Sequence, residues 1–174
     1  SLVERVFANG NEFTAAGNNV GGTVYSYDAT TGVYTIENVT ANQVITLTLK
    51  EIGVTVNGED ISAITGTGWA YNSQTQTLTL SRPNLTVSGT NSQDLAPNFR
   101  IVLGNAASSV TFSGLNITSG SDQPVQIQAA ECTLTAASKN TISAGNGAAT
   151  LLVAGGNLTV RGSGILNLCP SGGT

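Results

Sequence analysis

Short apolar segments with a polar residue at their centre recur through the second half of the chain, about once in every two dozen residues. The clearest are four triplets with a central threonine: Leu85-Thr86-Val87, Val110-Thr111-Phe112, Cys132-Thr133-Leu134 and Leu158-Thr159-Val160. Such a period is typical of a solenoid, in which each repeat buries its apolar face only by stacking on its neighbours. The pattern therefore predicts a stack of coils.

Two further apolar segments accompany each of the last three triplets, which predicts three strands per coil and hence a parallel β-helix. They are 101–103, 125–127 and 151–153 before the triplets, and 115–117, 140–142 and 166–168 after them. Because strand side chains alternate between two faces, we expect Val102 and Gln126 to point outward. The core is then expected to include Ile101, Leu103, Val125, Ile127, Leu151 and Val153. Asn116, Asn140 and Asn167 recur at nearly the same interval and predict an asparagine ladder along the coils.

The first 50 residues lack this repeat. Residues 8–19 are rich in Asn, Gly and Ala and are interpreted as turns, and 23–28, 33–37 and 44–50 as strands. The first two of these strands are separated by a loop of hairpin length that ends in Gly32. We expect a small antiparallel unit over 1–50 and a parallel β-helix over 51–174.

Residues 51–75 are expected to cap the first coil, because a solenoid needs its open end covered. Asn57-Gly58 is a turn signal within this segment. Trp69 and Tyr71 are expected to close the core, with a sugar-stacking platform as the alternative role.

The low charge of the chain excludes several classes of partner. Charged residues make up 9% of the sequence, the net charge is −4, and the six Lys and Arg residues form no cluster. Nucleic acid and anionic membrane surfaces are therefore not expected partners. No apolar run approaches the roughly 20 residues of a spanning helix, so we expect no membrane insertion. The absence of Met suggests a segment of a longer protein.

The absence of histidine removes Ser-His-Asp and Cys-His catalysis. Asp94 and Asp122 both precede the first strand of a coil, so they are candidates to lie on adjacent coils and repel one another. A Ca²⁺ ion would relieve that repulsion and bridge to an acidic sugar; the alternative is two solvated loops. Arg100 follows in the same coil. We expect no catalysis.

The two cysteines leave an alternative open. Cys132 occupies an apolar position in a triplet, where a small buried hydrophobe is expected, but a disulfide with Cys169 needs only a suitable offset between coils.

The threonine column is expected to face outward. Ice binding is one use of such a column, but ice-binding faces usually repeat two threonines per coil and this pattern leaves one. Ordinary β-propensity explains threonine on an exposed strand without any ligand.

Several longer stretches resemble bacterial carbohydrate-binding-domain-type β-helix proteins of the cell surface. They are 68–71, 77–80, 87–91, 110–118 and 156–164. The resemblance implies a right-handed parallel β-helix, a secreted or surface-attached location, and a similarity to calcium-dependent pectin-binding solenoids related to polysaccharide lyases. In lyase-like β-helices an arginine acts as base, but Arg100 here lacks the surrounding acid and lysine set. Residues 32–40 resemble the closing part of a bacterial surface Ig-like or B-repeat module.

Together these features predict a non-catalytic polysaccharide-binding or adhesion module, with Asp94, Asp122, Arg100, Trp69 and Tyr71 as candidate contacts. The rival interpretations are a purely structural stalk and a degenerate polysaccharide lyase. Longer relatives continue for further coils, so the C-terminal coil is expected to be open and able to associate with another chain.

Overall fold

The computed structural model describes residues 3–31, 33–145 and 149–170. Its described part is all-β apart from one short 3-10 turn, η1 (Ile61–Ala63), and it divides into two compact units, Ser1–Lys50 and Glu51–Thr174. No helix in the described ranges has the length and apolarity to cross a membrane.

The first unit is formed by two three-stranded antiparallel sheets, ordered β2-β1-β6 and β3-β4-β5. The strands are β1 (Val3–Ala8), β2 (Asn11–Glu12), β3 (Asn18–Val20), β4 (Thr23–Asp28), β5 (Val33–Glu37) and β6 (Ile45–Leu49). The predicted hairpin is confirmed by the pairing of β4 with β5, while Gly32 lies outside the described residues. The interpretation of 8–19 as turns was wrong for β2 and β3, and β1 was not foreseen. Val6 and Ala8 of β1 are buried because they pack in one cluster with Phe13 and Tyr25.

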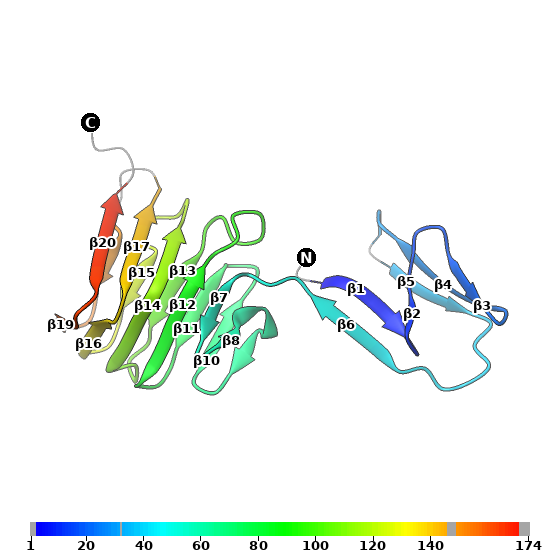
Figure 1. Ribbon diagram of the computed structural model, residues 1–174, viewed down its shortest axis with the longest axis horizontal. Helices are drawn as coiled ribbons and strands as arrows, with labels where there is room; N and C mark the ends of the chain where they lie inside the picture. The colour runs from blue at the N-terminus through cyan, green and yellow to red at the C-terminus, as the bar shows by residue number, and fades with distance from the viewer. Residues whose placement is uncertain (1–2, 32, 146–148, 171–174) are drawn as a thin grey trace. The chain divides into compact units, whose positions relative to one another are not determined.

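The second unit is a β-solenoid of about four coils, seen in Figure 1 as strands stacked one after another. Its coils contain β11 (Thr77–Leu80), β12 (Leu85–Thr90), β13 (Arg100–Leu103), β14 (Ser109–Thr118), β15 (Val125–Ile127), β16 (Glu131–Ala136), β17 (Lys139–Ala144), β18 (Leu151–Val153), β19 (Asn157–Arg161) and β20 (Ile165–Pro170). Successive coils pair in parallel, which confirms the predicted fold class.

Each coil contributes one strand segment to each of three faces, and β12 and β14 each contribute to two faces because they bend from one face to the next. Face 1 contains β11, β13, β15 and β18, and face 2 contains the first halves of β12 and β14 with β16 and β19. Face 3 contains the second halves of β12 and β14 with β17 and β20. The bends occur at Gly89 and Gly114, whose φ angles of 98° and 67° favour glycine.

The core is a set of apolar columns that run through the coils. Ile101, Leu103, Val125 and Ile127 are fully buried, as predicted, and Val102 and Gln126 face outward. Leu151 and Val153 continue the same columns but are only half-buried, because they lie in the last described coil.

Antiparallel strands cover the other end of the stack. They are β7 (Val54–Val56), β8 (Glu59–Asp60), β9 (Thr65–Gly66) and β10 (Trp69–Asn72). β7 pairs with β12 and β10 with β11, so both large sheets end in strands of reversed direction. The predicted turn at Asn57-Gly58 joins β7 to β8, with both residues at positive φ.

The third threonine triplet is displaced by two residues from its expected register. Thr86 pairs with Thr111 as predicted, but Thr111 pairs with Thr135, and Thr133 pairs with Ser109. A slip of two residues keeps every side chain on its own face. The alternation of Cys132 to Ala136 therefore fits either register.

The expected asparagine ladder is wrong. Asn116 and Asn167 both pair with Thr141 on the outer surface, whereas Asn140 points inward and is fully buried. Asn140 instead joins three coils through its own amide. Its Oδ1 accepts from the Leu115 amide at 2.9 Å, and its Nδ2 donates to the Ser138 and Ile165 carbonyl oxygens at 2.7 and 3.2 Å.

Candidate functional site

The two candidate calcium-binding carboxylates lie on separate exposed loops of the solenoid. Asp94 follows β12 and Asp122 follows β14. The Gly120 amide donates to the Pro97 carbonyl at 2.7 Å, so the loop of Asp122 stacks on residues several positions beyond Asp94. Within the described residues, no group of three or more Asp, Glu, Cys or His side chains could hold a metal ion. Calcium binding therefore stays a prediction. The described residues show no contact between the two carboxylates that would support it.

Arg100 binds the backbone of the next coil. Its Nη2 donates to the Asp122 carbonyl oxygen at 3.1 Å, and its Nε is buried without a hydrogen-bond partner. Among the described side chains the ion pair present is Arg5 with Glu12, so Arg100 has no carboxylate partner there. This geometry gives Arg100 a role in holding two loops together.

Trp69 and Tyr71 do not form a sugar-stacking platform. They are 3% and 2% exposed, because β10 turns both rings into the capped end of the core. The Tyr71 ring packs 6.1 Å from that of Phe99, and its hydroxyl is buried without a partner. Burial raises the pKa of Tyr71, because it disfavours the phenolate. The rings lie at the capped end, as the sequence predicted, and present almost no surface to solvent.

The cysteine alternative is resolved in favour of two free thiols. Cys132 is buried, with its Sγ 3.6 Å from the Ala107 carbonyl oxygen, whereas Cys169 is exposed. Burial raises the pKa of the Cys132 thiol, so it is suited to packing rather than nucleophilic chemistry.

The outer surface of face 2 carries two columns of hydroxyl groups where the sequence predicted one. We refer to them together as the hydroxyl array: Thr86, Thr111 and Thr135 in one column, and Ser109, Thr133 and Thr159 in the other. Their apolar neighbours point into the core, so the hydroxyls face outward and are half-buried or exposed.

The spacing within the hydroxyl array follows from sheet geometry. Neighbouring strands lie about 4.8 Å apart, and alternate residues along one strand about 6.6 Å apart. Charge appears only at the margin, where Arg161 continues the first column and Glu131 accepts from Asn157 at 2.9 Å. The hydroxyl array is therefore an uncharged surface of hydrogen-bond donors and acceptors, with charged groups only at its margin.

The first unit contains an apolar groove of about 310 Å³ that the sequence did not reveal. It is lined by Val6, Phe13, Tyr34, Ile36, Ile45 and Leu47. Tyr34 stacks on Tyr27 with ring centroids 4.5 Å apart and meets the edge of Phe13 at 5.5 Å. The alternation of Tyr34 with Ile36 and of Ile45 with Leu47 was the signal available. We did not expect the two strands to lie in different sheets.

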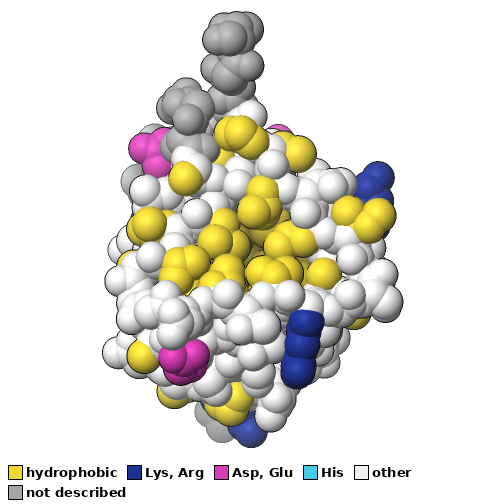
Figure 2. Space-filling model, turned by 90° about the vertical axis from the view of Figure 1, so that its left-hand side faces the viewer, with side chains coloured by type: hydrophobic (Ala, Val, Ile, Leu, Met, Phe, Trp, Pro, Cys, Tyr) yellow, Lys and Arg dark blue, Asp and Glu magenta, His cyan; other side chains and the backbone are white. Residues whose placement is uncertain are grey.

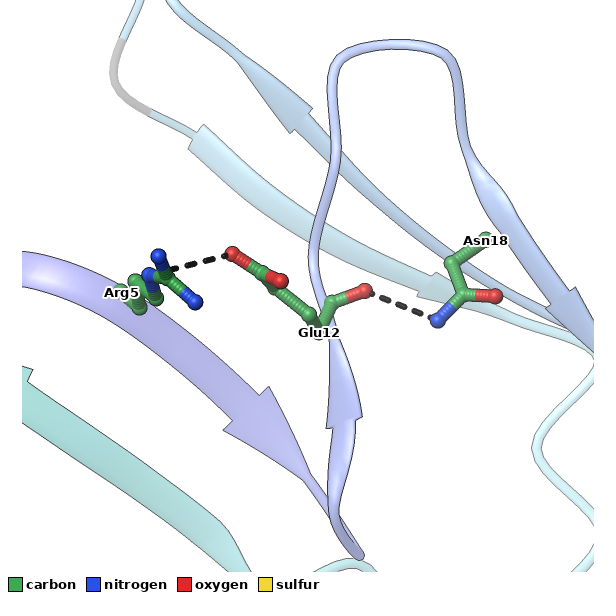
Figure 3. Close-up of polar contacts among 3 residues, drawn as sticks. All are labelled: Arg5, Glu12 and Asn18. Carbon is green, nitrogen blue, oxygen red and sulfur yellow. Dashed lines mark hydrogen bonds and ion pairs between the residues drawn. The ribbon is translucent and has the colours of Figure 1, made fainter.

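Polar contacts of the first unit lie elsewhere, as Figure 3 shows for Arg5, Glu12 and Asn18. Arg5 Nε is 3.8 Å from the Glu12 carboxylate, and Asn18 Nδ2 donates to the Glu12 carbonyl oxygen at 3.2 Å, which links β3 to β2. The groove lining is almost entirely hydrocarbon, which suits an apolar group better than a hydroxylated sugar.

The chain has no match among protein-family models, curated proteins or solved structures. The resemblance to carbohydrate-binding surface proteins therefore stays a prediction from the sequence.

Proposed function

We propose that the chain is a non-catalytic, secreted or surface-attached module that binds an extended, weakly charged polysaccharide along the hydroxyl array. The observation that carries the proposal is the register of face 2, which aligns hydroxyls of successive coils in two parallel columns. A polymer that follows the solenoid axis meets the same donors and acceptors at each coil. In this proposal the hydroxyl array, and not the buried rings of Trp69 and Tyr71, contacts the polysaccharide.

The affinity of such a surface is modest for each sugar. An exposed hydrogen bond replaces one made to water and contributes about 0.5–1.5 kcal/mol. A polymer gains by making several such contacts at once, because each later contact is intramolecular.

The absence of cleavage is part of the proposal. Proton transfer requires an acid or base within hydrogen-bond reach of the reacting atom, and the outward columns of face 2 present hydroxyls. Asp94, Asp122 and Arg100 belong to loops outside those columns. Incubation with pectin and xylan should release neither new reducing ends nor an unsaturated sugar that absorbs in the ultraviolet. Either product, lost in Asp122→Asn or Arg100→Gln, would favour the degenerate lyase instead.

The binding experiment compares two matched variants on a panel of soluble and immobilised polysaccharides, with calcium and with a chelator. Thr111→Val/Thr133→Val removes two hydroxyls from the array while keeping β-branched side chains. Thr141→Val removes one hydroxyl from face 3 by the same Thr-to-Val replacement and is the control. We expect the double variant to lose binding and the control to keep it. Equal binding by both, or no binding by the unaltered chain, would favour the structural stalk.

Ice binding is a second candidate function. The sequence predicted a single hydroxyl column, which argued against ice binding, but the structure has two columns. The two columns together place two hydroxyls on β14 and two on β16. Measurement of thermal hysteresis and of ice recrystallisation tests this candidate. Both effects should be absent if the ligand is a polysaccharide.

A further inference from the structure

The threonine hydroxyls of the array make no hydrogen bond to the rest of the described chain. Ser109 is the exception among the array residues, because its hydroxyl donates to the Asn84 side chain at 2.8 Å and accepts from the Asn84 amide. A free hydroxyl has one donor and two acceptor positions. The threonines of the array therefore keep their full hydrogen-bonding capacity for a ligand.

Threonine also limits where these hydroxyls can point. Its β-branched side chain is restricted at χ1, so the hydroxyl and the methyl group have few alternative positions. Thr86, Thr111 and Thr135 follow one another in register on three strands, and Thr133 pairs with Thr159. Each column is thus preorganised, and a ligand that binds to it costs little side-chain entropy.

The two columns define two rows of hydroxyls that run along the stack of coils. Ser109 and Thr111 lie two residues apart on β14, as Thr133 and Thr135 do on β16. The rows are then about 6.6 Å apart, with about 4.8 Å between successive groups of one row. A ligand that uses both rows must carry polar groups along two edges and repeat them at close to the strand spacing.

These two requirements distinguish polysaccharides by their linkage. A chain of β-1,4-linked hexoses is an extended ribbon with hydroxyl groups along both edges, and its advance per sugar is close to the strand spacing of about 4.8 Å. An α-1,4-linked or β-1,3-linked chain of the same sugar winds into a helix, so its hydroxyl groups leave a straight row after a few sugars. The ribbon can contact both rows at every coil, and the helical chains cannot.

The distribution of charge favours a neutral ribbon. Figure 2 looks onto the last described coil and shows charged side chains as isolated groups among uncharged ones. On face 2 the Glu131 carboxylate accepts from the Asn157 side chain at 2.9 Å, and Arg161 lies at the end of the first column. One charge of each sign at the margin provides no row of partners for a polymer of uronic acids.

We propose that the hydroxyl array selects neutral, β-1,4-linked hexose chains, such as glucan or mannan ribbons, that lie along the solenoid axis with one edge on each column. Such selection rests on the proposed function, because it names the class of polysaccharide that the array binds. In the complex the sugar rings lie over the threonine methyl groups, and the hydroxyls of the two edges exchange hydrogen bonds with the threonine Oγ1 atoms.

Isothermal titration calorimetry with three pentasaccharides of glucose tests the proposal on the whole chain. Cellopentaose is β-1,4-linked, maltopentaose is α-1,4-linked and laminaripentaose is β-1,3-linked, so these ligands differ in linkage but not in charge or composition. Mannopentaose is a second β-1,4-linked ligand. We expect at least one of the two β-1,4-linked chains to bind about tenfold more tightly, or better, than maltopentaose and laminaripentaose.

Two double variants test whether both rows contact the ribbon. Thr111→Val/Thr135→Val removes hydroxyls from the first column, and Thr133→Val/Thr159→Val removes them from the second. Each should weaken binding of the preferred β-1,4-linked ligand by about tenfold, whereas Thr141→Val on face 3 should leave it unchanged. The far-ultraviolet circular dichroism of all three variants should match that of the unaltered chain.

The possible failures separate this selection from the proposed function. Equal or tighter binding of maltopentaose or laminaripentaose would show a glycan-binding array that does not select by linkage. Loss of binding in one double variant alone would restrict the contact to one column and contradict a ribbon that lies on both. Binding of another polysaccharide, but of neither β-1,4-linked chain, would exclude the ribbon and keep the proposed function. Absence of binding to every polysaccharide would contradict both.

Discussion

At the scale of single residues, buried amides hold neighbouring coils together. Asn140 bonds to the coils before and after its own. Asn91, at an earlier corner, bonds to its own loop and to the next coil. Asn91 donates to the Ala96 and Thr118 carbonyl oxygens and accepts from the Thr118 amide at 3.0 Å. These side chains satisfy backbone groups at corners, where the parallel ladder is interrupted.

Replacement of Asn140 by Ala should lower the free energy of unfolding by about 3 kcal/mol, because it leaves the buried Leu115 amide without an acceptor. Asn116→Ala is the control, since Asn116 is exposed in the neighbouring coil and should change stability by less than about 0.5 kcal/mol. Urea denaturation gives both values. Equal effects of the two substitutions would contradict the inward position of Asn140.

A substitution at Tyr71, unlike that at Asn140, should increase the free energy of unfolding. Its hydroxyl is buried and unpaired, so Tyr71→Phe should raise the free energy of unfolding by about 1 kcal/mol at neutral pH. Burial raises the pKa of this phenol in the folded protein. The unfolded chain therefore loses its proton first as the pH rises, and stability falls from about pH 10 upward.

The advantage of the Phe variant should accordingly widen in alkaline solution. Melting temperatures of both proteins between neutral and alkaline pH test this. A lower melting temperature for Tyr71→Phe at neutral pH would indicate that the hydroxyl has a partner.

At the scale of elements, the bends of β12 and β14 decide how the strands pass from face 2 to face 3. Gly89 and Gly114 occupy equivalent bends in successive coils, but their surroundings differ. A Cβ on Gly89 would lie 2.1 Å from the Gly53 carbonyl oxygen in the cap, whereas one on Gly114 would have no atom within 4 Å.

Gly89→Ala should therefore destabilise the solenoid more than Gly114→Ala. Both variants place a side chain at positive φ, which costs about 1–2 kcal/mol, and only Gly89→Ala also displaces the cap strand β7. Thermal denaturation should show a clearly lower midpoint for Gly89→Ala. Indistinguishable midpoints would mean that the cap does not pack closely on β12.

The sequence predicts the elements of the solenoid well because its signals are local and repeated. Alternation of apolar and polar residues placed Ile101, Leu103, Val125 and Ile127 in the core, and the period gave the three strands of each coil. The same alternation could not decide the register of β16. Thr133 and Thr135 both face outward, so either of them could pair with Thr111 without turning a side chain to the other face. The inward position of Asn140 could not be predicted from the sequence either. Asn140 and Asn116 are the same residue type in similar segments, and only the hydrogen bonds that Asn140 makes at a corner distinguish them.

At the scale of the whole molecule, the two units contain different kinds of accessible surface. The first unit has an apolar groove beside the exposed ring of Tyr34, and the second has a hydroxyl array on one face. None of the candidate site residues predicted from the sequence belongs to the hydroxyl array. Single loop residues such as Asp94 stand out in a sequence, whereas a surface built from four coils appears only once their register is known.

The most direct test of the account is the dependence of affinity on oligosaccharide length, measured by isothermal titration calorimetry with a polysaccharide that the chain binds. Four coils at about 4.8 Å per strand spacing extend about 14 Å along the axis. Affinity should rise with each sugar until the oligosaccharide spans that length, then level off, and Thr111→Val/Thr133→Val should abolish the rise. Affinity that is independent of length, or a rise that survives in the double variant, would contradict binding along the hydroxyl array.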